Sequence, residues 1–544
     1  MVTTQNHVQD SQADQEPSPS PALNSTLGPH DVEEGTSHHG HYNPSEIERL
    51  GRQRPDAFKS IWIELGFGFS LLGSMFVAEY FISGFNIMLP SLSQALEIPS
   101  QAETWPASVF SLVTGSFLLP FGRLADMYGG YIVFNVGLMW FMIWSIIAGF
   151  SRNYIMLIVC RALQGFGPAA FMPSGIMLLG SLYRPGPRKN LVFSLYGAFA
   201  PIGFFAGIFF AGVAAQLMTW NWYFYIGSII LGVVAVASFL CIPSDRKSTI
   251  EKQGKTQVKM DWLGTAAIIP ALVLIVFAIT DGSHAPNGWA TPYVPITFVV
   301  GCLFFAGFVY IEGWVAEQPL LPFDMFDVKG MKPLAAALFL QYGTFGIFIF
   351  YASFYIEEVL HTGPLLTAAW FAPLCVGGLI LASIGGLVLH LLPGRVLLVV
   401  SGSAYILSTL LFAILPDDPN YWAYIFPAMI CSTLGIDIAY NIANIFFTTS
   451  LPRPRQGLAG AFANSLLFLG ISLFLGFADL AVTQTADRGR KESYKVAFWM
   501  ATGFAGAGLI IMFFGVKIGK ASSDLTIEER EELERMIASR ESVE

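Results

Sequence analysis

The sequence predicts an all-α membrane protein with fourteen transmembrane helices, and three observations lead to this prediction. Of the 544 residues, 54% are hydrophobic and only 12% are charged, whereas a soluble domain carries about 25% charged residues. The apolar residues come in blocks that match the roughly 20 helical residues needed to cross a bilayer. The blocks show no short alternating strands, which are the pattern of a transmembrane barrel.

The apolar blocks define the expected spans, because a helix satisfies its own backbone hydrogen bonds in lipid. The fourteen expected spans are residues 62–90, 104–124, 131–150, 154–180, 191–216, 221–243, 262–281, 292–316, 332–358, 365–389, 394–415, 420–447, 457–483 and 494–516.

The distribution of Lys and Arg predicts that both termini lie in the cytoplasm. Cytoplasmic loops of membrane proteins are enriched in these residues. With the N-terminus inside, the inner loops hold most of the basic residues, and the outer loops 91–103, 281–291, 357–364 and 416–419 hold none. The last outer loop departs from this bias, with Arg488, Arg490, Lys491 and Lys495.

The polar stretches between and outside the spans predict how the chain is divided. The first 60 residues lack the pattern of a cleavable signal, so the first span is expected to direct insertion. The expected parts are a disordered cytoplasmic tail 1–60, a six-helix half 61–243, a cytoplasmic linker 244–261, two extra helices 262–316, a cytoplasmic loop 317–331, a second six-helix half 332–516 and a cytoplasmic tail 517–544.

Several classes of function are not expected from this composition. The net charge of −9 comes largely from the tails and predicts no nucleic-acid surface. All five cysteines lie in apolar blocks, so we expect packing residues rather than disulfides. No phosphate-binding GxxxxGK[ST] loop is present, and we expect neither a cofactor nor a metal. A membrane-embedded enzyme would need paired catalytic groups, but His284, His361 and His390 have no supporting cluster.

Four motifs in the first half carry a family resemblance. They are Gly122–Gly130 after the second span, Arg161–Gly167 in the fourth, Gly197–Gly203 in the fifth and Trp220–Tyr225 at the start of the sixth. In this order they resemble the loop 2–3 signature, the span 4 Arg motif, the antiporter-type span 5 motif and the span 6 entry of the major facilitator superfamily. The resemblance implies a major facilitator fold of two six-helix halves.

Later segments narrow the resemblance. Asp261–Gly264 and Glu312–Pro322 resemble the fourteen-span drug:proton antiporter branch, in which two extra spans separate the halves. Gly435–Ile438, Gln456–Ala459 and Gly476–Asp479 are similar to segments of the fungal aminotriazole-resistance, boron-export and low-affinity ammonium transporter group.

Two positions depart from the pattern of the antiporter branch. That branch usually has an Asp in span 1, nine residues before the proline that is Pro90 here, and this chain has Phe81 instead. In the loop 2–3 signature, Met127 and Gly130 stand where basic residues usually follow the Asp. The usual acid of span 1 and the usual charge contact of this loop are therefore not available.

Ionisable side chains inside the spans are the candidate site residues, because each costs about 2.5–3.5 kcal/mol at mid-membrane unless it faces a cavity or a partner. Glu79 is expected to bind a proton or a cation, with Ser83 and Asn86 on the same helix face; otherwise it reaches toward the surface or pairs structurally. Arg161, with Gln164, is expected to tune a nearby acid, or else to hold spans together through backbone carbonyls.

The second half supplies a polar stripe on span 12. Asp437, Tyr440, Asn441 and Asn444 follow at helical spacing and are expected to bind solute or protons, the alternative being interhelical hydrogen bonds worth about 0.6 kcal/mol each. Gln341 and Tyr342 are candidates in span 9. With the two extra spans set aside, spans 1, 4, 9 and 12 are the first and fourth helices of each half, which line the central cavity in this superfamily.

A separate group of residues is expected to act in gating. Asp126, near Gly122 at the end of span 2, is expected to stabilise one gate state by meeting a helix N-terminus or a basic residue. In span 5, close helix approach and a bend are expected at small residues and a proline, although ordinary tight packing would use the same residues. These residues are Gly197, Pro201, Gly203 and Gly207.

The resemblance implies a secondary active transporter that works by alternating access, with proton-coupled export of a small toxic compound or metabolite. A carrier for ammonium or borate, and a non-transporting receptor on the carrier fold, are the alternatives. The expected partners are a small molecule or ion, protons and the lipid bilayer, and we expect a monomer. The plasma membrane is the expected location, with the vacuolar membrane as the alternative.

Overall fold

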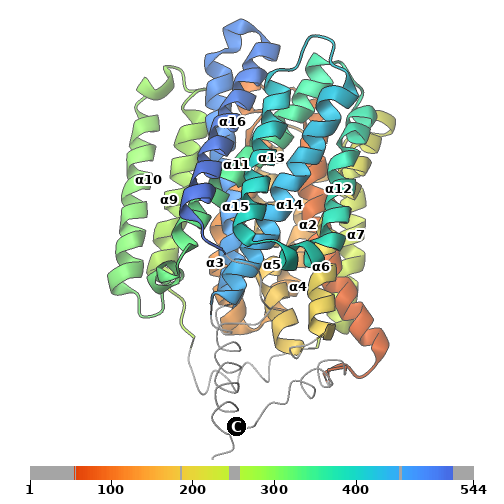
Figure 1. Cartoon of the computed structure of the whole chain (residues 1–544), viewed down its shortest axis with the longest axis vertical. Coiled ribbons are helices and arrows are strands. Elements are labelled where there is room, and N and C mark those ends of the chain that lie inside the picture. Colours follow the sequence, from red (N-terminus) through yellow and green to blue (C-terminus); the bar gives the residue numbers. More distant parts are fainter. Residues whose placement is uncertain (1–53, 56, 184–186, 244–257, 452–455, 519–544) are drawn as a thin grey trace, which may run out of the picture.

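The computed structural model contains fourteen helices that are long and apolar enough to cross a membrane (Figure 1). Within the described residues every regular element is a helix, which confirms the predicted fold class and number of spans. The structure describes residues 54–55, 57–183, 187–243, 258–451 and 456–518. Most of the predicted linker 244–261 and of the predicted tails 1–60 and 517–544 lies outside these residues.

The long helices follow the predicted spans closely. The first one continues through Pro90 to Ala95, because a proline removes only one backbone donor and the following residues still find theirs. The helices are α2 (Ile61–Ala95), α3 (Trp105–Tyr128), α4 (Gly130–Gly149), α5 (Tyr154–Leu182), α6 (Pro187–Leu217), α7 (Asn221–Cys241), α9 (Trp262–Asp281), α10 (Tyr293–Tyr310), α11 (Met331–Phe354), α12 (Pro364–Leu391), α13 (Gly394–Ala413), α14 (Phe426–Thr449), α15 (Gln456–Gln484) and α16 (Arg490–Gly515). Helical turns 311–315, 355–359 and 421–425 extend α10, α11 and α14.

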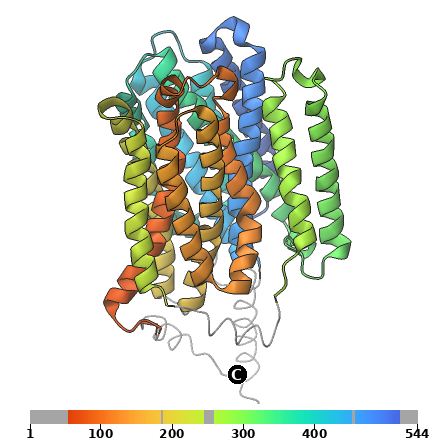
Figure 2. The ribbon, with the colours of Figure 1, turned by 180° about the vertical axis from the view of Figure 1, so that it is seen from behind.

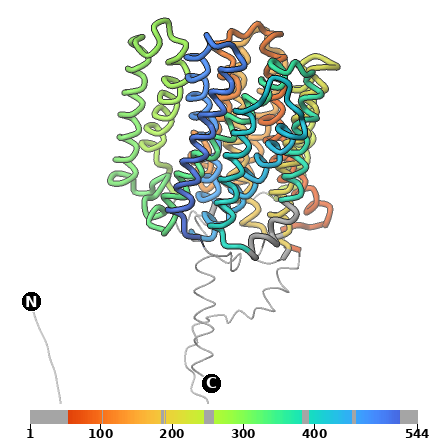
Figure 3. The backbone as a smooth tube through the Cα atoms, turned by 45° about the horizontal axis from the view of Figure 1, so that its top comes forward, coloured from red at the N-terminus to blue at the C-terminus, as the bar shows by residue number. Residues whose placement is uncertain are grey.

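The helices form two sets and a separate hairpin. Helices α2–α7 pack mainly with one another and are called the N-terminal set, and α11–α16 form the C-terminal set. The sets meet chiefly where α3 packs against α15 and α6 against α12. The α9–α10 hairpin stands at one side of the bundle in every view (Figures 1, 2 and 3). We call the end of the bundle with Ile61 and Tyr128 the lower end, and the other the upper end.

Close packing of α2 against α6 depends on glycine. A Cβ atom on Gly207 would lie 2.4 Å from the backbone oxygen of Tyr80, and one on Gly203 would lie 2.3 Å from that of Phe76. On the α2 side, a Cβ on Gly84 would lie 2.2 Å from the backbone oxygen of Gly207. Only the missing side chains let the two backbones come this near, as in other membrane helix pairs.

A buried ion pair joins three helices of the N-terminal set at the lower end. Arg188 of α6 donates to both carboxylate oxygens of Glu64 on α2, over 2.7 and 2.6 Å. Tyr183, just after α5, donates its hydroxyl to the same carboxylate over 3.1 Å. Such a two-pronged contact is stronger than a single hydrogen bond and also fixes the orientation of the two side chains.

Replacing Glu64 by Ala should therefore destabilise the N-terminal set. We expect a loss of about 1.5–3 kcal/mol, the range for hydrogen bonds to charged groups. The loss should not exceed this range, because Arg188 keeps partial access to water. The midpoint of thermal unfolding in detergent measures this effect. Glu317→Ala is the matched control, because its ion pair with Lys259 is exposed and surface pairs contribute little. Equal midpoints for the two variants would contradict the assignment.

Candidate functional site

Two carboxyl groups from different helix sets lie near the middle of their helices. Glu79 on α2 and Asp437 on α14 are half-buried and within electrostatic range of each other. Among the described residues, neither carboxyl group is paired with a Lys or Arg side chain. The structure therefore brings together the two acids that the sequence predicted separately. An acid pair without a cation is costly inside a membrane, so it is a candidate binding site.

Helices α6 and α12 bring small residues next to Asp437. A Cβ on Gly378 of α12 would lie 3.0 Å from Asp437 Oδ2 and 3.2 Å from the side chain of Pro201 on α6. The predicted gating residue Pro201 is thus a neighbour of the acid at a point where the two helix sets cross. Motion of α6 against α12 would change the surroundings of the carboxylate directly.

The polar stripe of α14 is present, but its amide groups are partly used within the helix. Asn441 donates to the backbone oxygen of Asp437 over 2.8 Å, and Asn444 donates to that of Tyr440 over 3.0 Å. The hydroxyl of Tyr440 donates to the side-chain oxygen of Asn464 on α15 over 3.2 Å. The stripe therefore combines interhelical contacts with side chains that remain half-buried beside Asp437.

Two polar residues near the acids were not predicted from the sequence. Asn464 is buried on α15 and accepts the Tyr440 hydrogen bond. Tyr196 is buried on α6, interacts electrostatically with Glu79 and Tyr440, and its hydroxyl has no hydrogen-bond partner among the described residues. Asn464 could have been predicted as a site residue, because it is an amide side chain in a largely apolar span. Nothing in the sequence around Tyr196 indicated that its hydroxyl would lie near the acids.

Ser83 and Asn86, predicted to share the face of Glu79, have separate roles in the structure. Ser83 is fully buried and donates to the backbone oxygens of Glu79 and Phe204, each over 2.8 Å, so it ties α2 to α6. Asn86 donates to the backbone oxygen of Ile82 over 2.9 Å and stays half-buried. Of these two residues, the half-buried Asn86 is the better placed to meet a solute.

Arg161 is enclosed by the N-terminal set. It donates to the backbone oxygen of Pro106 over 3.2 Å and to Gln164 over 3.1 Å, and Gln164 donates in turn to Ser145 over 2.8 Å. Its guanidinium carbon lies 4.0 Å and 4.2 Å from the ring centres of Phe85 and Phe110. These contacts include no carboxylate, and the contact with the backbone oxygen of Pro106 is of the kind expected in the alternative, in which Arg161 holds spans together.

Gln341 and Tyr342 are buried in the C-terminal set. Gln341 donates to the backbone oxygen of Ala505 over 3.1 Å and packs against Gly402 and Gly508, so it faces α13 and α16 rather than α2. Tyr342 is in electrostatic range of Tyr440, and its hydroxyl has no partner among the described residues. Tyr342 therefore lies nearer to the α14 stripe than its neighbour does.

Phe81 occupies the core of an aromatic cluster. Its ring centre is 5.1 Å from that of Tyr80, 5.0 Å from Phe141 and 5.7 Å from Tyr223, and it is completely buried. The cluster is locked by Tyr80 and Tyr223, which each donate a hydroxyl to the backbone oxygen of the other, over 2.9 and 2.7 Å. This position belongs to the packing of α2 against α4 and α7.

Of the predicted gating residues, Gly122 lies where the two sets approach at the lower end. A Cβ on Gly122 would be 3.5 Å from Pro173 of α5 and 3.9 Å from Ala461 of α15. Asp126 is exposed at the end of α3, near Arg123. Gly197 lies in open space, with no atom within 4 Å of a Cβ built on it, whereas Gly203 and Gly207 are in close contact with α2.

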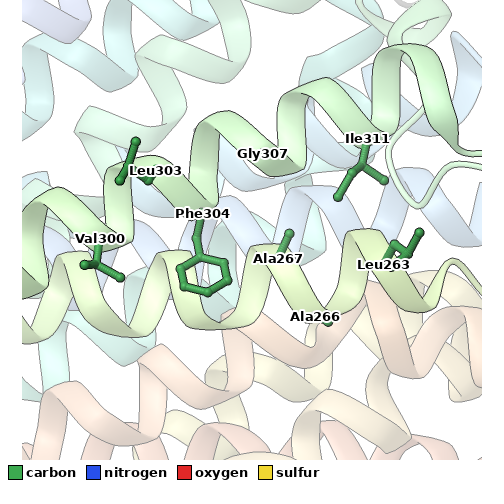
Figure 4. Close-up of a pocket in the computed structure, with 8 residues that line it drawn as sticks. All are labelled: Leu263, Ala266, Ala267, Val300, Leu303, Phe304, Gly307 and Ile311. Carbon is green, nitrogen blue, oxygen red and sulfur yellow. The ribbon is translucent and has the colours of Figure 1, made fainter.

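A groove of about 430 Å³ between α9 and α10 lies apart from these residues (Figure 4). Figure 4 shows its lining side chains on the two helices of the hairpin, all of them apolar. A site for a charged or polar solute needs polar groups that fix its orientation. The lining residues are Leu263, Ala266, Ala267, Val300, Leu303, Phe304, Gly307 and Ile311.

Solved structures of transporters share this architecture. The chain aligns with an auto-inhibited peptide transporter of the POT family at a TM-score of 0.61 and 14% identity, covering 86% of this chain and 100% of that one. It also aligns with the nucleoside transporter NupG at a TM-score of 0.54 and 13% identity, covering 83% and 97% of the two chains. At these identities the likeness concerns the fold alone.

Relatives of known sequence match more closely. A low affinity ammonium transporter of Saccharomyces cerevisiae is 36% identical over 415 residues, covering 75% of this chain and 79% of that protein. The efflux pump terJ of Aspergillus terreus is 29% identical over 491 residues, covering 88% and 93%. The aminotriazole resistance protein of Saccharomyces cerevisiae is 30% identical over 468 residues, covering 84% and 85%. The resemblance predicted from the motifs is confirmed.

The family model of the Major Facilitator Superfamily matches residues 71–475, from α2 into α15. The match takes in α3 to α14, with the hairpin among them, and parts of α2 and α15. The relatives are membrane transporters rather than enzymes. This chain is therefore a transporter of the major facilitator superfamily.

Proposed function

We propose that this transporter exports a small toxic compound or metabolite, driven by the proton gradient, and that Glu79 and Asp437 bind the solute and the proton in turn. The observation that carries the proposal is the pair of half-buried carboxyl groups on different helix sets, with no Lys or Arg partner among the described residues. In this proposal the two sets are the two six-helix domains, and they rock about the acid pair.

The physical reason for coupling is the cost of charge in the membrane. An isolated carboxylate at this depth is strongly disfavoured unless it gains a proton or a cation. Because the two carboxyl groups come from different helix sets, the stability of each protonation state depends on how the sets are arranged. A proton or a solute that favours one arrangement shifts the population toward it. This property is what alternating access requires.

Among the remaining candidate residues, we propose that Asn86, Tyr196, Tyr342, Tyr440 and Asn464 contribute polar contacts to the solute. Asn86 and Tyr440 are half-buried, and the hydroxyls of Tyr196 and Tyr342 have no partner among the described residues. Asn464 is buried and holds the hydroxyl of Tyr440. Arg161 is instead proposed to hold α2, α3 and α5 together, because its partners are a backbone oxygen, an amide and two rings.

Transport of a small inorganic solute such as ammonium or borate is the second candidate. The 36% identity to a low affinity ammonium transporter favours it, and an acid pair without a basic partner would accept a small cation well. Efflux of an organic compound is favoured by the efflux pumps and the aminotriazole resistance protein among the relatives. Both candidates use the same acids, so the solute must be found by measurement.

We further propose that the lower end faces the cytoplasm, with both termini on that side, in the plasma membrane. The basic residues of the connections at this end support the orientation. The protein is proposed to act as a monomer, since the proposed site lies between helix sets of one chain.

Flux in proteoliposomes under an imposed pH gradient tests the proposal. Aminotriazole, methylammonium and borate should be screened as solutes, each with the gradient in both directions. We expect one solute to move against its concentration gradient when protons run the other way, and a protonophore to abolish this movement. Uphill flux of no solute, or uphill flux that ignores the pH gradient, would contradict proton coupling. Empty liposomes and liposomes with heat-denatured protein are the controls.

A further inference from the structure

The α9–α10 hairpin lies along the seam where α3 of the N-terminal set meets α15 of the C-terminal set. Helix α9 packs against both of these helices. The ring of Phe277 lies 5.7 Å from that of Trp105 at the upper end of α3. On the other side, Thr280 fits against Gly476 of α15, where a Cβ would lie only 2.6 Å from its hydroxyl oxygen. The hairpin therefore contacts both helix sets.

At the lower end, the hairpin is attached to the N-terminal set. Arg123 of α3 donates to the side-chain oxygen of Gln318 over 2.8 Å and to the backbone oxygen of Lys259 over 3.1 Å. The same oxygen of Gln318 accepts from the backbone N–H of Lys259 over 2.9 Å. Lys259 precedes α9 and Gln318 follows α10, so Arg123 holds both ends of the hairpin.

At the upper end, a polar contact attaches the hairpin to the C-terminal set. Nε2 of His284, in the connection from α9 to α10, lies 2.5 Å from Oδ2 of Asp479 on α15. Both side chains are only 7% exposed. Nδ1 of His284 is buried and has no hydrogen-bond partner among the described residues. This contact is a polar link between the upper connection and α15.

Several charged and titratable groups surround this contact. Asp281 at the end of α9 faces His284 and accepts the hydroxyl of Tyr293 from α10 over 2.6 Å. Burial lowers the pKa of His284, but its hydrogen bond to Asp479 and the charges of Asp479 and Asp281 outweigh burial and raise the pKa above its usual value. Glu103 of the α2–α3 connection and Tyr351 of α11 interact electrostatically with Asp479. Three further groups interact with Glu103 or Tyr351: Glu358 in the turn that extends α11, and Arg490 and Tyr494 of α16.

Besides His284, Glu103 is a group at the upper end, outside the spans, whose pKa is shifted. Burial, together with the charge of Glu358, raises its pKa to about 7. Arg490 opposes this effect and is paired with Glu358. A change of pH near neutrality therefore alters the charge on both sides of the upper seam, and a test of His284 has to hold Glu103 constant.

We propose that the hairpin is a strap whose polar attachments at its two ends are to opposite helix sets, and that the His284–Asp479 contact is a latch that closes the upper end and strengthens when His284 is protonated. Opening the upper end separates α3 from α15 there. Because Arg123 holds the hairpin to the N-terminal set, this separation breaks the latch. The sign follows from the raised pKa of His284: the latch has its full strength below the ordinary pKa of histidine and loses it as the pH rises through the raised value.

Distance measurements across the upper end test the latch without any solute. Spin labels at Ala95→Cys and Asp418→Cys, in a background without native cysteines, report the separation of the two sets in lipid nanodiscs. At about pH 5, below the ordinary pKa of histidine, we expect His284→Ala and Asp479→Asn each to raise the ratio of open to closed molecules about tenfold. His361→Ala is the matched control, because this exposed histidine lies at the same end and outside the hairpin.

A second variant isolates the charge. His284→Arg, measured together with Glu103→Gln, keeps a positive charge at all pH values, so its distance distribution should stay closed from about pH 5 to about pH 8, where histidine titrates. The Glu103→Gln parent should open over this range. The proposal is overturned if His284→Ala keeps the wild-type distances, or if His284→Arg opens with pH as its parent does. Elution as a single species in size-exclusion chromatography verifies that each variant is folded.

Discussion

Asp437→Asn is expected to abolish proton-driven transport while leaving the protein folded. The asparagine has nearly the same shape but cannot carry charge, so neither a cation nor a proton is held at this position. Loss of one charged partner in a buried contact costs about 2–5 kcal/mol, which corresponds to a loss of about 30-fold or more in affinity. Initial rates of uphill flux in proteoliposomes, at several solute concentrations, measure the effect.

Glu79→Gln should have a similar effect, and the double variant should be no worse than the more severe single variant. Two groups that act as one unit are not additive. Glu312→Gln is the control, because Glu312 is also a buried acid but caps the end of the hairpin by accepting from the backbone N–H groups of Leu320 and Leu321. Wild-type uphill flux in Asp437→Asn would remove Asp437 from the proposed site.

Gly207→Ala is expected to destabilise the packing of α2 against α6. The added methyl group would lie 2.4 Å from the backbone oxygen of Tyr80 and 2.8 Å from its Cα atom, so α2 and α6 would have to move apart. Overpacking of this kind costs about 1–3 kcal/mol. We expect a lower thermal unfolding midpoint in detergent and slower transport, because α2 and α6 carry Glu79 and Pro201.

Gly197→Ala is the matched control on the same helix. No atom lies within 4 Å of a Cβ at this position, and alanine stabilises a helix interior by about 1 kcal/mol relative to glycine. Its unfolding midpoint should equal or exceed that of the wild type. If Gly197→Ala and Gly207→Ala lower the midpoint equally, close packing is not the reason why Gly207 is required.

The spans were predictable from the sequence because length and apolar composition alone decide which helices cross a bilayer. Glu79 and Asp437 could be named as separate candidates, since each is a rare charge in a long apolar block, but the sequence did not show that they lie near each other. Side-chain direction was harder to predict. Helical spacing placed Ser83 on the face of Glu79, yet its hydroxyl turns to the backbone of α6 at Phe204. The close approach of α6 that makes this possible depends on Gly203 and Gly207.

Contacts between distant segments could not be predicted from spacing at all. Arg161 was expected beside an acid, but the rings of Phe85 and Phe110 enclose it. A guanidinium group is less strongly hydrated than an ammonium group and stacks well on aromatic rings. The contact of His284 with Asp479 joins residues 195 positions apart in the chain. Neither residue had a motif that pointed to the other.

The rings around Phe81 limit how this carrier could be re-engineered. Grafting an aspartate at position 81 would bury it against Tyr80, Phe141 and Tyr223, with their ring centres now 5–6 Å from that of Phe81. A group placed there could exchange protons with water only if the aromatic wall were rebuilt with smaller side chains. Moving the acid from position 79 to position 81 would therefore take more than one pair of substitutions. Designs that alter ion coupling should keep Phe81 and start from Glu79.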